Sequence, residues 1–111
     1  MSHGRLIIVT RAKGMEGFLA ILREMMWHAN FSYYPEYFVY ARSIGLGLDE
    51  CVAKVILCPQ LVEGETKEPL KYQGMGSYPE AAIQDVAYQA MAGLRTRCLE
   101  LQTSHTFAYF P

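Results

Sequence analysis

The sequence has no long apolar run, and none of its hydrophobic stretches approaches the roughly 18 residues that a membrane-spanning helix needs. The opening residues, MSHGRLIIVT, hold too short an apolar run for a secretory signal peptide. The chain also has no repeat and no low-complexity tract. These absences predict an intracellular protein, cytoplasmic or nuclear, with no membrane partner.

Cysteine and histidine are scarce, with three of each in 111 residues. An odd number of cysteines in a chain that is half apolar indicates reduced thiols rather than a disulfide framework. Cys51 and Cys58 are seven residues apart, which would place them on opposite faces of a strand. The histidines show no metal-ligand spacing. The sequence therefore predicts no metal site and no cofactor.

Positive charge is scarce in most of the chain, whose formal net charge is −1. Residues 1–35 hold four basic and two acidic side chains, whereas the other 76 residues hold six basic and nine acidic ones. A nucleic-acid-binding domain normally has a basic face, because phosphate neutralisation supplies much of its affinity. The net charge of the larger part of this chain is negative, which does not suit nucleic-acid binding.

The sequence does contain a clear succession of periodic segments. Apolar residues recur every three or four positions from Met15 to Ala29, which predicts a helix. Aromatic and β-branched runs predict three strands, at residues 36–43, 51–58 and 70–76. The run RLIIVT, residues 5–10, predicts a further strand near the N-terminus.

A second helix is signalled after the third of these strands. Ser77 and Glu80 match the spacing of a capping box, and Pro79 suits a first helical turn. An apolar stripe then continues over about five turns. Its members are Ile83, Val86, Ala87, Ala90, Met91, Leu94, Cys98 and Leu101.

Together these segments predict one α+β domain over residues 1–111, with a core from about 15 to 101. The order is α-β-β-β-α, with a three-stranded antiparallel sheet and both helices on one of its faces. The strand at residues 5–10 is an addition to that core. The aromatic tail at residues 103–111 either adds an edge strand or lies over the core as a flap.

This order resembles the double-stranded-RNA-binding domain, and several marked positions agree with it. PEY at residues 35–37 matches the Pro-x-Tyr that opens the family's first strand. Gly74-Met75-Gly76 matches the Gly-x-Gly that leaves its third strand. Small residues of the second helix match at Ala82, Ala87 and Ala90, with Leu94 closing the set. The resemblance covers residues 15–94 and implies the same fold.

The departures from the family fall on its RNA-contacting positions. The alignment places Tyr78 at the family's Ser, Pro79 and Glu80 at its paired lysines, and Ile83 at its last lysine. The first hairpin, residues 43–51, carries two acids and lacks the family's His. Ile83 belongs either to the core stripe, which its period favours, or to an exposed apolar contact. The resemblance thus implies a fold whose duplex-RNA binding is lost or weakened.

The first functional hypothesis is a non-catalytic protein-interaction or dimerisation module. Family members without RNA contacts often bind adaptors or dimerise through the third strand and second helix. The partner would be another protein or a second copy, in a homodimer through the third strand. Leu70 and Tyr72 share one face of that strand, whose open edge is able to pair with another chain. Tyr78 and Tyr88, off the helical stripe, would add an exposed contact patch.

Two alternatives remain open from the sequence. Weak binding of double-stranded RNA would survive if Arg11, Lys13 and Arg23, near the first helix, replaced the lost contacts. A small enzyme built on Cys and His is the other alternative. No nucleophile elbow, phosphate loop or His-Glu-x-x-His string is present, so we expect no enzymatic activity.

Overall fold

A computed structural model describes residues 4–12, 14, 16–29, 31, 35–59 and 68–97 of the chain. Its elements follow one another as β1 (Arg5–Thr10), α1 (Phe18–His28), β2 (Tyr37–Gly45), β3 (Leu48–Leu57), β4 (Leu70–Gly76) and α2 (Pro79–Arg97). The predicted α+β class is confirmed. Lys13, Met15, Cys98 and the aromatic tail lie outside the described residues.

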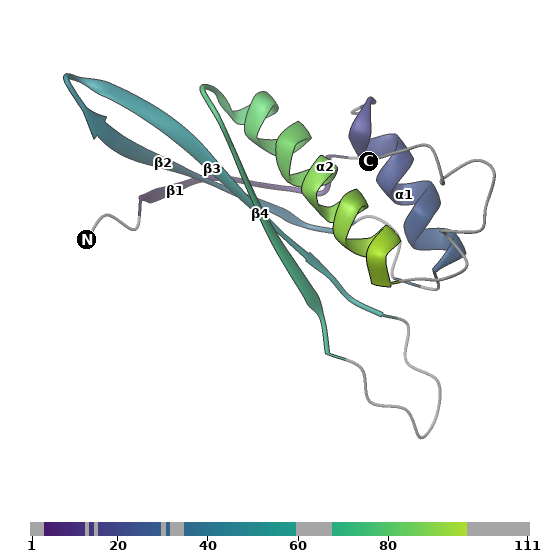
Figure 1. Ribbon diagram of the computed structural model, residues 1–111. Helices are drawn as coiled ribbons and strands as arrows, with labels where there is room; N and C mark the ends of the chain where they lie inside the picture. Colours follow the sequence, from purple (N-terminus) through teal and green to yellow (C-terminus); the bar gives the residue numbers. More distant parts are fainter. Residues whose placement is uncertain are drawn as a thin grey trace.

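The sheet is antiparallel throughout, with strand order β1-β2-β3-β4. Both helices lie on the same face of it, and α2 runs between β4 and α1 (Figure 1). The predicted three-stranded sheet is therefore extended to four strands. The additional strand is β1, residues 5–10, which pairs with the outer side of β2. Its register shifts between Leu6 and Ile8, so Ile7 forms a bulge in this edge strand.

The β2–β3 hairpin projects beyond the helices (Figure 1) and turns more tightly than the sequence indicates. Gly45 pairs with Leu48, which leaves a two-residue loop. Both loop residues have positive φ, 55° at Leu46 and 71° at Gly47, as a type I′ turn requires. The strands therefore extend to Gly45 and from Leu48, beyond the predicted ends at 43 and 51. The sequence does not indicate this turn, because leucine, here Leu46, rarely adopts a positive φ.

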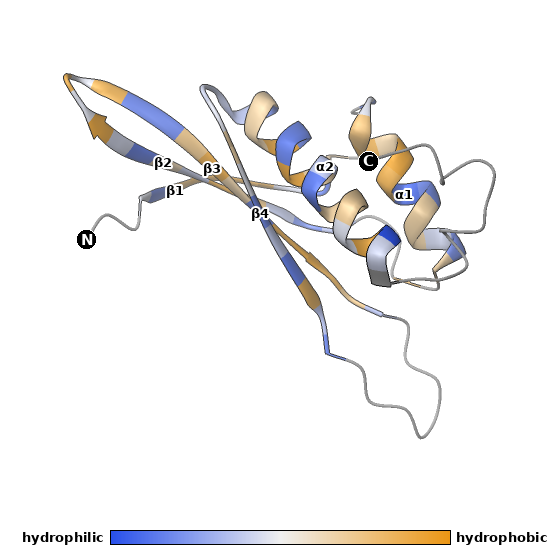
Figure 2. Ribbon diagram, in the orientation of Figure 1, coloured by the Kyte–Doolittle hydropathy of each residue, from blue (hydrophilic) through white to orange (hydrophobic). Residues whose placement is uncertain are grey.

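The core lies between the sheet and the two helices, and the side chains buried there among the described residues are hydrophobic, with the Tyr37 hydroxyl as a buried polar atom. Tyr37, Val39, Ala53 and Val55 alternate with outward residues along β2 and β3 and are almost fully buried. In Figure 2, much of α1 and β3 is coloured orange, which marks hydrophobic residues. The predicted helical stripes are confirmed where described except at Phe18, which the spacing placed on the buried face but which is 37 % exposed. The buried helical residues are Leu19, Leu22, Met25, Met26, Ala82, Ile83, Val86, Ala87, Ala90, Met91 and Leu94.

Two glycines of β4 let α2 approach the sheet at backbone distance. A Cβ on Gly74 would lie 2.7 Å from the Cα atom of Val86. A Cβ on Gly76 would lie 2.6 Å from the backbone nitrogen of Ala82. Backbone atoms cannot swing aside as a flexible side chain does, so no larger residue fits at either position. The Gly-x-Gly sequence thus sets the separation of α2 from β4.

The N-terminus of α1 is capped by a residue of α2. Gly17 precedes α1 with φ of 76° and supplies no side-chain cap. The side chain of Gln84 takes that role: its Oε1 accepts from the Phe18 N–H at 3.0 Å, and its Nε2 donates to the Glu16 carbonyl at 2.8 Å. This explains why α1 begins at Phe18 rather than at the predicted Met15: its first orphan N–H is satisfied by a distant residue.

The start of α2 is one residue later than the predicted capping box requires. The carbonyl of Tyr78 accepts the first helical hydrogen bond, from the Ala82 N–H at 3.1 Å, so Tyr78 is the N-cap. Ser77 lies one position outside the helix. Pro79 is the first helical residue, as expected for a residue without an N–H.

We expect Gly74→Ala to lower the free energy of unfolding by about 2–3 kcal/mol, because the new methyl group would force α2 away from β4. Gly14→Ala is the matched control, since a Cβ at that position would meet no atom within 4 Å and the φ of Gly14 is not positive. Urea unfolding measures both. Equal stability of the Gly74 variant and the wild type would show that the α2–β4 contact is looser than described.

Tyr37 is 1 % exposed, and its hydroxyl has no hydrogen-bond partner among the described residues. Burial raises the pKa of this phenol, and the Arg23 charge opposes that rise only partly. We expect Tyr37→Phe to raise the free energy of unfolding by about 1 kcal/mol, since it removes an unsatisfied polar atom. Tyr78→Phe, at an exposed position, should leave it unchanged. A loss of stability in Tyr37→Phe, measured by urea unfolding, would contradict this account.

Candidate interaction site at the free edge of β4

The candidate site is the β4 edge, by which we mean the side of β4 that faces away from β3, together with Asp85, Gly93 and Thr96 of α2. β4 pairs with β3 over its full length, from Leu70 to Gly76. Among the described strands it has no neighbour on its other side. An edge of this kind presents backbone groups to any chain that adds a further strand.

The direction of the backbone groups on β4 follows from one hydrogen bond. The Met75 N–H donates to Asp85 Oδ2 at 2.8 Å, so the backbone of Met75 faces away from β3. Residues alternate in an antiparallel pair, and a residue's N–H and C=O point to the same side. Lys71 and Gln73 therefore face the free edge as well. Asp85 covers one end of the edge and leaves these two residues available for pairing.

A groove of about 290 Å³ lies beside this stretch of backbone. It is lined by Leu70, Lys71 and Tyr72 of β4 and by Gly93 and Thr96 of α2. The ring of Tyr72 lies so close to Gly93 that a Cβ there would overlap it. Gly93 thus makes room for this ring between strand and helix.

Leu70 and Tyr72 lie on the same face of β4, as predicted, and that face points toward α2. Both side chains are partly buried and pack against the core. Both residues also line the groove. Their contribution to an interaction surface is therefore through the shape of the groove.

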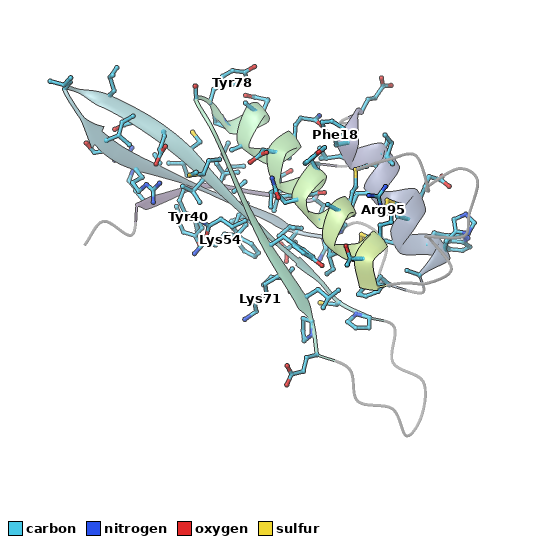
Figure 3. All side chains as sticks on the ribbon, viewed as in Figure 1. Phe18, Tyr40, Lys54, Lys71, Tyr78 and Arg95 are labelled. Carbon is cyan, nitrogen blue, oxygen red and sulfur yellow. The ribbon has the colours of Figure 1, made fainter. Side chains whose placement is uncertain are left out.

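The two tyrosines predicted to form an exposed patch lie in different surroundings. Tyr78, at the turn between β4 and α2, is 59 % exposed and stands out from the body (Figure 3). Tyr88 is partly buried, and its ring packs edge-on against Phe18 at a centroid distance of 5.2 Å. Tyr88 thus holds α2 against α1, and it does not join Tyr78 in one exposed patch.

The positions aligned with the family's lysines carry no positive charge. Pro79 is partly buried at the first residue of α2. Glu80 is exposed in the first turn, where a negative charge interacts favourably with the helix dipole. Ile83 is 3 % exposed, which confirms its assignment to the core stripe over an exposed apolar contact. A phosphate near this helix end would meet one acid and no base at these positions.

The basic residues considered for RNA binding are partly occupied by contacts of their own. Arg11 lies 3.9 Å from Glu36, and both side chains are about half exposed. Arg23 is partly buried on α1, where its charge acts on the Tyr37 phenol in the core. Lys13 lies outside the described residues. Exposed ion pairs of this kind are weak, so Arg11 is not held away from a phosphate by much free energy.

Cys51 is poorly suited to nucleophilic chemistry. Burial raises the pKa of the Cys51 thiol, and the carboxylates of Asp49 and Glu80 add to that rise. A thiol with a raised pKa is a poor nucleophile at neutral pH. Cys58 is exposed. Within the described ranges no three His, Cys, Asp or Glu residues gather as a metal site would require, and none of the helices is both long and apolar enough to cross a membrane.

Comparison with known proteins identifies no family model that matches this chain. It also finds no curated protein and no solved structure with significant similarity to it.

Two residues that shape the site carry no distinctive signal in the sequence. In the sequence, Asp85 is a polar residue off the apolar stripe of α2. Only the tertiary packing brings it to the Met75 amide. Gly93 reads as a weak point in a helix, yet it accommodates Tyr72. A glycine between two buried helical positions was the one available clue.

We expect Asp85→Ala to speed hydrogen exchange of the Met75 amide by about fivefold to tenfold, because the N–H loses its charged acceptor and opens to water. Exchange monitored by NMR measures this at single-residue resolution. Asp49→Ala, which removes an exposed acid from the β2–β3 hairpin, is the control and should not alter it. Unchanged exchange in Asp85→Ala would mean that the amide is protected by something other than this carboxylate.

Proposed function

We propose that this chain is a non-catalytic interaction module that adds strands at the β4 edge, on a fold similar to the double-stranded-RNA-binding domain. One observation carries the proposal: the backbone groups of Lys71 and Gln73 face an open edge beside a groove between β4 and α2. Backbone pairing supplies affinity in such complexes, and an adjacent groove receives side chains of the added strand.

The fold assignment is supported by the order of elements and by the role of the shared residues. The elements follow in the family's order, which is α1, β2, β3, β4 and α2. Both helices lie on one face of the sheet. The Gly-x-Gly of β4 and the small residues of α2 meet in the tight helix–sheet contact. β1 is an addition on the far side of β2.

Loss of the family's phosphate contacts is supported by the N-terminal turn of α2. Three positions that would carry lysines hold Pro79, Glu80 and the buried Ile83. Each missing phosphate contact removes nearly one unit from the salt dependence of binding, and the acid adds repulsion. Retained binding through Arg11 and Arg23 has less support, because Arg23 is partly buried on α1.

The occupant that fits the β4 edge is a second copy of the chain. Two β4 strands related by a two-fold axis would pair antiparallel and join the sheets of two molecules. The hydrogen bond between the Met75 N–H and Asp85 determines which residues of the two β4 strands can pair. An axis at Gln73 would require the Met75 N–H, which Asp85 already holds. An axis at Tyr72 pairs Lys71 with Gln73 of the other copy, and it uses only the open backbone groups.

The register with its axis at Tyr72 also places an aromatic pair at the centre of the dimer. Tyr72 of each copy would lie opposite its equivalent in a non-hydrogen-bonded pair, where side chains approach most closely. Each ring already rests against Gly93 and is therefore held in place. The joint would be short, with two backbone pairs flanking one aromatic pair. We therefore expect a moderate affinity that depends strongly on protein concentration.

Gln73→Pro tests the proposal. The Gln73 N–H faces the free edge, so proline there removes a donor to an added strand without removing a hydrogen bond to β3. We expect wild-type protein to sediment as a concentration-dependent dimer in analytical ultracentrifugation. Gln73→Pro should weaken that dimer at least tenfold.

Gln73→Ala is the matched control, because it loses the same side chain but keeps the N–H, and it should dimerise like the wild type. Thermal unfolding must show that the Pro variant is folded. A wild type that stays monomeric at the highest concentration, or a Gln73→Pro variant that dimerises normally, would contradict pairing at the β4 edge.

A further inference from the structure

The face of the sheet opposite the helices, here called the outer face, is not covered by any described element. Alternation along the strands places Phe38 and Tyr40 of β2 and Lys54 and Ile56 of β3 on this face. Lys71 of β4 joins them, opposite Ile56. Figure 3 shows Tyr40, Lys54 and Lys71 on the side of the sheet away from α1 and α2.

These side chains surround an open depression of about 540 Å³. That volume is within the range of small-ligand sites. Phe38 and Tyr40 stand two residues apart on an interior strand, so the sheet fixes the backbone positions from which both rings extend. The Lys54 ammonium lies over the Tyr40 ring, 5.2 Å from its centroid. Gln73 adds an amide at the border of the depression.

The charge of the outer face is positive, unlike that of the chain as a whole. Among the described strands, Glu50 is the one acidic residue whose position in the register places it there. It is bonded by the Arg42 guanidinium, with Nε donating to Oε1 at 2.7 Å. The charges of Lys54 and Lys71 therefore remain available to an anion. Leu6 and Val9 of β1, each 49 % exposed, extend the apolar surface beside the two rings.

We propose that the outer face binds single-stranded nucleic acid, with bases stacked on Phe38 and Tyr40 and phosphates beside Lys54 and Lys71. Four-stranded sheets with aromatic side chains on an open face bind two or three bases in this way. Stacking with flanking positive charge is the general pattern for single strands. This inference is independent of the proposed function, because it uses the face of the sheet and not the edge of β4.

A second copy of the chain fits this face less well. Face-to-face stacking of two copies would bring four lysines together, and the described strands offer no unpaired acid there to neutralise them. A duplex also fits poorly, because its bases are already stacked on one another and offer no free faces to the two rings. The arrangement thus favours a single strand over either occupant.

The experiment is a fluorescence-anisotropy titration of the full chain with labelled ten-nucleotide RNA and DNA of one mixed sequence, and with the corresponding duplexes. We expect saturable binding of the single strands and at least tenfold weaker binding of the duplexes. Two phosphate contacts predict a slope of about −1.4 in a plot of log affinity against log salt concentration. Tighter binding of RNA than of DNA would indicate a contact with the 2′-hydroxyl.

The variants Phe38→Leu and Tyr40→Leu should each weaken single-strand binding about tenfold, since each removes one stacking surface but keeps an apolar side chain. Lys54→Gln should reduce the magnitude of the salt slope by about 0.7. Tyr78→Leu, which removes an exposed tyrosine elsewhere, is the matched control and should bind like the wild type. Circular dichroism checks that each variant is folded.

The proposal is overturned if no saturable binding occurs at low salt, or if both ring variants bind like the wild type. It is also overturned if duplexes bind as tightly as single strands. Dimerisation that Tyr40→Leu abolishes, in the absence of oligonucleotide binding, would assign the face to a second copy instead. The oligonucleotide titration reports on the outer face and Gln73→Pro reports on the β4 edge, so failure of one proposal is distinguishable from failure of the other; a dimer that depends on Tyr40 and not on Gln73 would count against both.

Discussion

The backbone contact between α2 and β4 is the constraint on which the rest of this structure depends. Gly74 and Gly76 let the helix backbone rest on the strand, and the alanines of α2 complete the fit. That closeness brings the Asp85 carboxylate to the Met75 amide. Interiors of proteins pack densely enough that such a separation, once set, fixes the positions of the surrounding side chains.

Two surfaces with different chemistry result from this packing. The β4 edge offers backbone groups and a groove, which suit an added strand whose own sequence matters little. The outer face offers rings and lysines, which suit a ligand with bases and phosphates. The two surfaces share β4 but use different atoms of it: the edge uses its backbone, and the face uses the side chains of Lys71 and Gln73. Strand pairing would therefore leave the rings of β2 accessible.

The asymmetry of the sheet explains why a chain with net charge −1 can still present a basic surface. Along β2, Tyr37 and Val39 enter the core while Phe38 and Tyr40 face outward. Along β3, Ala53 and Val55 are buried while Lys54 is exposed. Among the described residues, Asp49 and Glu50 are the acids that lie in a strand, and the others lie in helices or between elements. The overall charge argued against nucleic acid, but the charge of one face is what a ligand meets.

The sequence by itself determined the elements and the core. Apolar spacing located both helices and all four strands to within a few residues, and it placed Ile83 among buried residues, because periodicity records which side of an element faces away from water. Tertiary structure alone decided four contacts. These are the pairing of β1 with β2, the capping of α1 by Gln84, the hydrogen bond from the Met75 N–H to Asp85, and the packing of Tyr72 against Gly93. The Gln84 side chain, for example, meets an amide 66 positions away in the chain. Local periodicity shows which face of a helix or strand is buried, whereas the residues that contact that face depend on how distant segments pack together.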